Sequence, residues 1–187
     1  TIPLEGKPEF PVSDGKGKLY VNIEDKSLIS VIDVKSMKVE KSWPIAPGEE
    51  ASGLALDNET HRLFSVCSNK LMVVVDALDG HVVTTLPIGD GCDGVKFDPG
   101  IKRAYSSNGD GTMTVVQELN KDSFKVLENV ITMSGSRTLA VDTRTHHIYL
   151  PSAEYNPAPA ATTENPRPRR TMKAGSFAVL DIAPVKK

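Results

Sequence analysis

One short pattern occurs four times in this chain of 187 residues. In each unit an apolar run ends in aspartate, a turn follows, and an aromatic residue opens a second apolar run. The aspartates are Asp14, Asp57, Asp98 and Asp142, separated by 43, 41 and 44 residues, and the aromatics Tyr20, Phe64, Tyr105 and Tyr149 keep nearly the same step. A period in the forties, carried by β-branched residues, is typical of propeller blades. The sequence therefore predicts an all-β fold, a β-propeller.

Each unit contains four apolar stretches broken by turn residues, which predicts four strands per blade. The predicted blades span about residues 8–45, 51–88, 93–131 and 136–182 of a single domain that covers residues 1–187. The fourth unit lacks an outer strand of its own. Because Ile2-Pro3-Leu4 matches Trp43-Pro44-Ile45, we expect residues 1–4 to be a latch strand that completes the last blade. A proline is compatible with such an outermost strand.

Composition favours a globular domain. The chain is 39% hydrophobic with a net charge of −2, which gives no reason to expect disorder or a nucleic-acid-binding field. No stretch approaches the roughly 20 apolar residues that cross a bilayer. The chain begins at Thr1 without a signal peptide, so we expect a processed product or a piece of a longer protein.

The two cysteines, Cys67 and Cys92, lie in a second strand and in the loop that enters the next blade. They are either a disulfide between adjacent blades or two small buried side chains. CxxC and CxxCH motifs are absent, which removes the sequence signals of zinc, thiol-redox and covalent haem sites. His61, His146 and His147 fall in turns between first and second strands, where we expect exposed side chains.

In a propeller, the loops that join outer to inner strands and second to third strands surround one mouth of the central channel. Binding groups gather on loops that a rigid scaffold positions. We therefore predict a ligand-binding mouth face formed by Glu24, Asp25, Glu49, Asn69, Asp90, Asp93, Asn108, Asp110 and Arg137. The same residue types are required by tight turns, so a purely structural role is the alternative.

Two Gly-Asp-Gly segments lie on this face, centred on Asp90 and Asp110. Calcium prefers several carboxylate and carbonyl oxygens, so Asp90, Asp93 and Asp110 are the candidate metal ligands. Calcium is the candidate cofactor, and no other cofactor is predicted. The run from Asn108 to Gly111 equally fits a hairpin turn, because Asn and Gly tolerate positive φ.

An insertion interrupts the fourth unit between its second and third strands. Tyr149 and Asp181 are 32 residues apart, whereas Phe64 and Asp76 are separated by 12. Residues 151–175 contain five prolines, a density that favours extended chain. The insertion also carries the basic residues Arg167, Arg169, Arg170 and Lys173.

Arginine suits carboxylate and phosphate groups. We therefore predict a partner-binding loop that uses Arg167, Arg169 and Arg170 to contact an unknown protein or a small anionic ligand. The alternatives are a lid over the channel and a solvent-exposed loop without function. Four basic residues in a net-acidic chain argue against nucleic acid.

The chain resembles the YVTN-repeat, YncE-like β-propellers of bacteria over nearly its whole length, the proline-rich insertion excepted. The matching stretches are residues 18–22 with 30–33, residues 62–64 with 74–76 and 80–89, and residues 106–112. Members of that group generally carry an export signal, act outside the cytoplasm and have seven blades. The resemblance implies a periplasmic or secreted protein. It also implies that four blades are the C-terminal part of a longer propeller, with the missing blades or a second copy as partners.

Three classes of function remain open. A non-enzymatic binding or scaffold propeller is favoured, because no nucleophile, base and oxyanion donors can be assigned. A hydrolase resembling the lactonases on related propellers needs metal-binding carboxylates at the channel, whereas the inner strands here are mostly apolar. A subunit resembling the propellers of quinoprotein amine dehydrogenases could serve only as a scaffold, since the chain has no haem motif.

Overall fold

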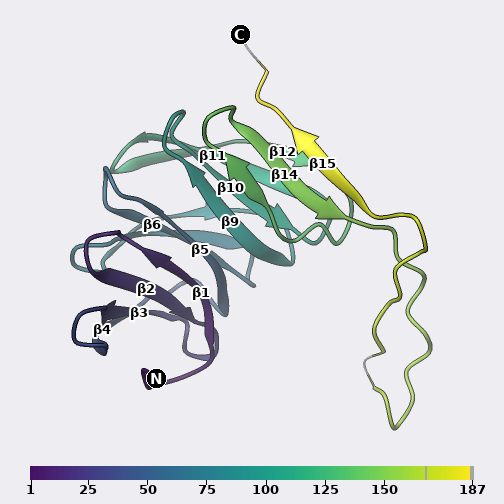
Figure 1. The fold of residues 1–187 in the computed structure, drawn as a ribbon, viewed down its shortest axis with the longest axis horizontal. Coiled ribbons are helices and arrows are strands. Elements are labelled where there is room, and N and C mark those ends of the chain that lie inside the picture. Colours follow the sequence, from purple (N-terminus) through teal and green to yellow (C-terminus); the bar gives the residue numbers. More distant parts are fainter. Residues whose placement is uncertain (167, 186–187) are drawn as a thin grey trace.

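The computed structural model describes residues 1–166 and 168–185. Nearly all regular structure in this part of the chain is β-strand, arranged in four antiparallel sheets (Figure 1). The first sheet contains β1 (Pro8–Ser13), β2 (Lys18–Ile23), β3 (Leu28–Asp33) and β4 (Lys38–Pro44), with the 3-10 helix η1 (Glu24–Lys26) between β2 and β3. The second contains β5 (Ala51–Asp57), β6 (Arg62–Cys67), β7 (Leu71–Asp76) and β8 (Val82–Pro87). The third contains β9 (Cys92–Asp98), β10 (Arg103–Asn108), β11 (Thr112–Asn120) and β12 (Ser123–Ile131), and the fourth β13 (Ala140–Asp142), β14 (His147–Ser152) and β15 (Ala178–Ile182).

Within every sheet each strand pairs with the strand that follows it in the chain. The four sheets succeed one another along an arc from the N-terminal to the C-terminal end of the chain (Figure 1). Neighbouring inner strands contact one another, β1 with β5, β5 with β9 and β9 with β13. Each sheet is therefore one blade, numbered here in chain order, and the predicted all-β blade architecture is confirmed.

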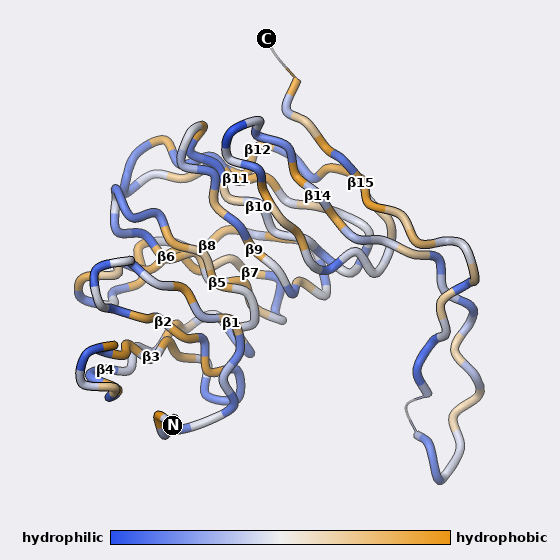
Figure 2. Tube along the Cα trace, in the orientation of Figure 1, coloured by the Kyte–Doolittle hydropathy of each residue, from blue (hydrophilic) through white to orange (hydrophobic). Residues whose placement is uncertain are grey.

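The hydrophobic core is divided among the junctions between successive blades. The repeated aromatic residue of β6, Phe64, is fully buried and stacks on Phe97 of the third blade, with ring centroids 5.1 Å apart. It also meets the edge of Phe124 at 5.8 Å. In β14 the equivalent Tyr149 is only half-buried, because none of the sheets formed by the described residues covers that side of the fourth blade. The apolar strands of the blades contrast with the polar end of the long β14–β15 connection in Figure 2.

The four repeated aspartates shape the turns between first and second strands. Asp57 accepts hydrogen bonds from the Glu59 N–H at 3.0 Å and the Thr60 hydroxyl at 2.8 Å. The turns also join adjacent blades, since Lys102 of the third blade lies 3.3 Å from Asp57 of the second. His146 makes the corresponding contact one junction later.

The Nδ1 atom of His146 lies 2.8 Å from Oδ2 of Asp98, a residue with no exposed surface. This contact joins the fourth blade to the third. The expectation that the turn histidines are simply exposed is therefore wrong for His146, whose side chain is 32% exposed, and His61 and His147 are likewise only partly exposed. The alignment placed it in the correct turn but could not show that it reaches the preceding blade.

The first N-terminal residues do not form the predicted latch. Residues 1–4 form no strand, and no described strand pairs with the free edge of β15. Instead Ile2 and Leu4 pack against the buried Val21 and Ile23 of the first blade. The physical reason is that the blades form an open arc, so a segment only a few residues from β1 cannot reach the fourth blade (Figure 1).

Cys67 and Cys92 are free, buried thiols. The Cys92 thiol donates to the backbone carbonyl of Cys67, with 3.1 Å between sulfur and oxygen. Burial raises the pKa of Cys67 to about 12 and that of Cys92 to about 11. Of the two sequence alternatives, the structure shows two small buried side chains at the junction of the second and third blades.

Glu118, near the end of β11, is only 5% exposed, and burial raises the pKa of its carboxyl group to about 7. A folded-state pKa above the ordinary value of 4.5 means that the folded chain holds this proton more tightly than the unfolded chain. The stabilisation is fully present below about pH 4.5 and is lost as the pH rises through about 7. We expect the loss to be on the order of 3 kcal/mol.

Urea unfolding of the natural chain and of Glu118→Gln at pH 5 and pH 8 measures this effect. The difference in unfolding free energy between the two proteins should shift in favour of the variant at pH 8. An identical difference at both pH values contradicts the assignment, because other titrating groups are shared by the two proteins.

Candidate partner-binding face

The loops predicted to surround the mouth meet in pairs across each blade junction. The Ser68 N–H donates to the Glu49 carbonyl at 2.9 Å, which joins the β6–β7 turn to the β4–β5 loop. At the next junction the Gly109 N–H donates to the Gly91 carbonyl at 3.0 Å, and the Gly135 N–H donates to Gly109 at 2.9 Å. Because backbone hydrogen bonds link these loops, the mouth face is a continuous and well-supported surface.

At the first two blades, three of the four predicted side chains make local contacts, and Glu49 takes part in these contacts through its backbone. Glu24 forms an ion pair with Lys7, and the Asp25 carboxylate accepts the Lys7 N–H at 2.7 Å. Asn69 accepts the Glu49 N–H at 3.2 Å and donates to the Pro47 carbonyl at 2.8 Å. These side chains hold the loops in place.

The two Gly-Asp-Gly segments lie side by side. The Asp110 carboxylate accepts the Asp90 N–H at 2.8 Å and the Thr112 hydroxyl at 2.7 Å, while Asp90 lies 3.1 Å from the Lys70 ammonium. Although partial burial opposes it, these hydrogen bonds lower the pKa of Asp110. Gly111 has a φ of 94°, as a hairpin turn requires. The hairpin alternative therefore accounts for much of this segment.

A cation held by Asp90, Asp93 and Asp110 stays a prediction. Within residues 1–166 and 168–185, one group of three carboxylate or imidazole side chains lies close enough together to share an ion. It consists of Asp76, Asp79 and His81, at the edge of the second blade. If calcium binds at the mouth face, it should raise the melting temperature, and Asp110→Asn should abolish the rise.

Asn108 has a structural role. It has no exposed surface, and its amide donates to the hydroxyl oxygens of Thr112 and Thr114, each at 3.0 Å. Its carbonyl oxygen accepts the Ser106 hydroxyl at 2.9 Å. Asn108 therefore cannot contact a ligand on the surface without rearrangement of β10 and β11.

Asp93 and Arg137 differ from the other predicted residues because both line one cavity. The Arg137 guanidinium lies 3.5 Å from the Asp93 carboxylate, and both side chains are substantially exposed. The cavity has a volume of about 310 Å³ and lies where the β14–β15 connection leaves the fourth blade, and we call it the arm-root pocket. Its other walls are formed by Gly135, Thr138, Pro151, Ser152, Ala153, Tyr155, Met172 and Phe177.

The β14–β15 connection forms a long arm that projects away from the blades (Figure 1). Its two sides pair near the root, where Tyr155 bridges to Met172 and the Lys173 ammonium lies 2.8 Å from Glu154. Beyond this pairing almost every described residue is exposed, including Arg169 and Arg170. The third arginine of the predicted partner-binding loop, Arg167, lies outside the described residues.

Sequence reasoning missed the apolar part of this site. Tyr155, Met172 and Phe177 are 45%, 50% and 62% exposed, and all three line the arm-root pocket. Their scattered positions in an irregular segment gave no periodic signal. The available signal was the unusual coincidence of aromatic and methionine residues with arginines inside one insertion, since these types are enriched in interfaces.

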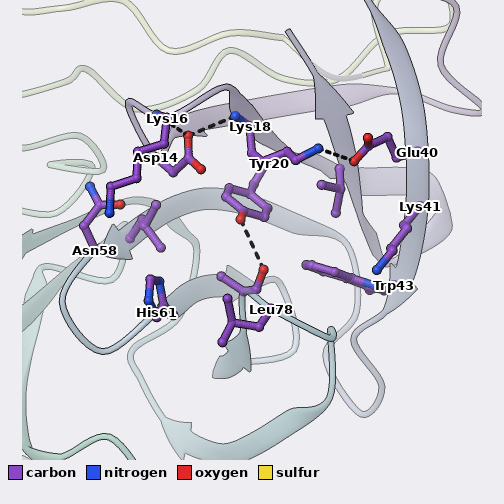
Figure 3. A pocket seen from close by; sticks show the side chains of 13 residues that line it. Asp14, Lys16, Lys18, Tyr20, Glu40, Lys41, Trp43, Asn58, His61 and Leu78 are labelled. Atoms are coloured by element: carbon purple, nitrogen blue, oxygen red, sulfur yellow. Dashed lines mark hydrogen bonds and ion pairs between the residues drawn. The ribbon is translucent and has the colours of Figure 1, made fainter. Parts of the chain in front are cut away.

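A second cavity, of about 230 Å³, lies between the first and second blades on the opposite face (Figure 3). Tyr20 and Trp43 stack on its wall with ring centroids 6.1 Å apart, and the Tyr20 hydroxyl donates to the Ala77 carbonyl at 3.1 Å. Lys18 is paired with both Asp33 and Glu40. Because these polar groups already have partners in the fold, the arm-root pocket is the better candidate for recognition.

Comparisons with known proteins identify the fold. No protein-family model matches the chain, and no curated protein matches it. Among solved structures, hydrazine synthase of Kuenenia stuttgartiensis is similar with a TM-score of 0.69 at 16% identity, over 79% of this chain and 44% of that one. The Cps50 (Swd1) β-propeller domain of Myceliophteria thermophila is similar with a TM-score of 0.60 at 13% identity, over 80% and 50%. The RRP9 WD40 repeats are similar with a TM-score of 0.64 at 17% identity, over 81% of this chain and 46% of that one.

The fold is that of a β-propeller. The chain spans about half the length, or less, of the solved propellers that it resembles. Among the described residues no helix is long and apolar enough to cross a membrane. These likenesses concern the fold, since the identities are all below 20%.

Proposed function

We propose that this chain is a non-enzymatic binding propeller of the YncE-like type, which holds a protein partner at the mouth face with its arm. The observation that carries the proposal is the arm itself. Ordering an extended segment costs conformational entropy, yet the arm buries almost none of its side chains against the blades. A partner that packs along the arm would supply the missing contacts.

The chemistry of the arm and its root suggests the kind of partner. Arg169 and Arg170 on the arm, with Arg137 at the root, provide guanidinium groups suited to carboxylates. Tyr155 and Phe177 provide exposed aromatic surface beside them. This combination fits an acidic protein segment that inserts an apolar side chain into the arm-root pocket.

The resemblance to the YVTN-repeat propellers supports a role outside the cytoplasm. The fold supports a binding or scaffold role, because a propeller presents many loops on one rigid face. We favour this function over the lactonase-type and quinoprotein-type alternatives, since the carboxylates of Asp25, Asp90 and Asp110 on the mouth face are engaged in loop contacts.

Selection of acidic peptides from a displayed library tests the proposal. The selected peptides are then measured against a variant in which residues 157–170 are replaced by two glycines. This deletion ends beside the Asn156 N–H, which donates to the Thr171 carbonyl at 2.9 Å, so the paired root is kept. We expect binding at least tenfold weaker in the deletion variant, with an unchanged melting temperature.

Arg169→Glu with Arg170→Glu provides the matched charge variant, and Lys125→Glu, on the exposed part of β12, is its control. The double variant should lose most of the affinity and the control should keep it. Peptides that bind the natural chain and the arm deletion equally well would contradict the proposal.

A further inference from the structure

A separate cavity lies between the second and third blades, on the face opposite the mouth. Its volume is about 540 Å³. Its walls come from the β5–β6 turn, the chain after β7, the β9–β10 turn and the hairpin between β11 and β12. The arm and the mouth-face loops contribute nothing to it.

The carboxyl group of Glu118, on the wall of this cavity, lacks hydrogen-bond donors. Although 95% of the residue is withdrawn from solvent, neither oxygen of its carboxyl group has a hydrogen-bond partner. An ionised carboxylate accepts several hydrogen bonds, and burying it without them is costly. Both oxygens are closed to solvent, so a donor that enters the cavity would supply the missing hydrogen bonds once the Glu118 side chain turns toward it.

The cationic side chains of the cavity are already paired elsewhere. The Lys102 ammonium lies 2.6 Å from Glu59 and 3.3 Å from Asp57. The Arg62 guanidinium lies 2.7 Å from Asp76 and also donates to Asp122 and to the backbone carbonyls of Thr60, His61 and Lys121. Lys121, the third cation of the lining, lies 2.8 Å from Asp122. None of the three cations is hydrogen-bonded to Glu118, although the charge of Lys102 favours its ionised form.

Two leucines add an apolar element to the same cavity. Leu78 is 64% exposed and Leu119 is 60% exposed, and both line it. Apolar surface beside a buried acceptor matches a molecule with an apolar stem and a terminal donor. We propose that this cavity binds a small organic cation, an ammonium or guanidinium group on an apolar stem, with the cation on the Glu118 carboxylate.

Binding should depend on pH. Burial raises the pKa of Glu118 to about 7, so the carboxyl group is mostly ionised at pH 8 and mostly protonated at pH 5.5. A bound cation gains a charge partner only when Glu118 is ionised. The other charged or titratable groups around the cavity are Asp57, Glu59, His61, Arg62, Asp76, Lys102 and Lys121. His61→Gln is measured in parallel to separate its contribution.

Titration of the full chain with n-butylammonium, followed by NMR chemical shifts, tests the proposal. We expect saturable shifts at the Glu118, Leu119 and Leu78 amides at pH 8. The affinity should fall at least fivefold at pH 5.5 and at least tenfold in Glu118→Gln. Glu128→Gln on exposed β12 is the matched control and should bind as the natural chain does. n-Butylguanidinium in a second titration distinguishes the two cation types.

Neutral n-butanol should bind at least tenfold more weakly than n-butylammonium. Leu119→Ser, at an exposed position that cannot unfold the core, should weaken butylammonium binding at least threefold. The proposal is overturned if neither cation saturates the natural chain at pH 8. It is equally overturned if Glu118→Gln, folded by its melting curve, binds both cations as well as the natural chain.

Discussion

Replacing Phe64 by alanine should destabilise the chain by about 3–5 kcal/mol. Phe64 has no exposed surface and lies between Phe97 and Phe124, so its removal leaves a cavity at the junction of the second and third blades. Because these aromatic neighbours belong to the next blade, the loss measures packing between blades. Urea unfolding monitored by circular dichroism measures the change in unfolding free energy.

Tyr149→Ala is the matched control, since Tyr149 occupies the same position of the repeat in the fourth blade. Its side chain is only half-buried, and no described sheet packs over it. We expect it to lose less than half as much stability as Phe64→Ala. Equal losses would show that the aromatic position stabilises each blade internally and not the junction.

Replacing Arg62 by methionine should cost about 3–5 kcal/mol, because it removes one partner of a buried ion pair. Only 3% of the Arg62 side chain and 12% of the Asp76 side chain are exposed, and their charged atoms lie 2.7 Å apart. Methionine fills part of the space but leaves the Asp76 carboxylate without its counter-ion. The unfolding free energy at pH 7 gives the loss.

Lys18→Met tests the same position of the repeat in an exposed setting. Lys18 pairs with Asp33 at 3.3 Å, but their side chains are 34% and 24% exposed. Solvent screens such a pair, so we expect a change of at most about 1 kcal/mol. If Arg62→Met lost as little unfolding free energy as Lys18→Met, burial of this ion pair would not make the fold depend on it more strongly.

Much of the fold could be predicted from the sequence because the repeat records a physical requirement. Asp57 and its equivalents close a turn, and Tyr20, Phe64 and Tyr105 fill the junctions between successive blades, so the repeat keeps both residue types at nearly fixed spacing. The prediction of a latch strand was wrong because it rested only on the sequence match of Ile2 and Leu4 to the end of an outer strand. The match says nothing about which blade lies within reach of that segment.

The candidate site was predicted only in part. Turn chemistry placed Asp93 and Arg137 on the mouth face, but it could not distinguish them from Asp90 or Asn108, which the loops use for their own hydrogen bonds. Glu118 was missed because an isolated glutamate in a strand looks solvent-exposed in sequence. Its burial results from the meeting of two blades, which no local pattern contains.

A double-mutant cycle between Asp98 and His146 tests the radial arrangement of the blades most directly. The two residues are 48 positions apart in the chain and belong to the third and fourth blades, yet their side chains lie 2.8 Å apart. Unfolding free energies of Asp98→Asn, His146→Gln and the double variant should give a coupling energy of about 1 kcal/mol or more. Additive effects within about 0.3 kcal/mol would contradict the arrangement, because distant and independent sites behave that way.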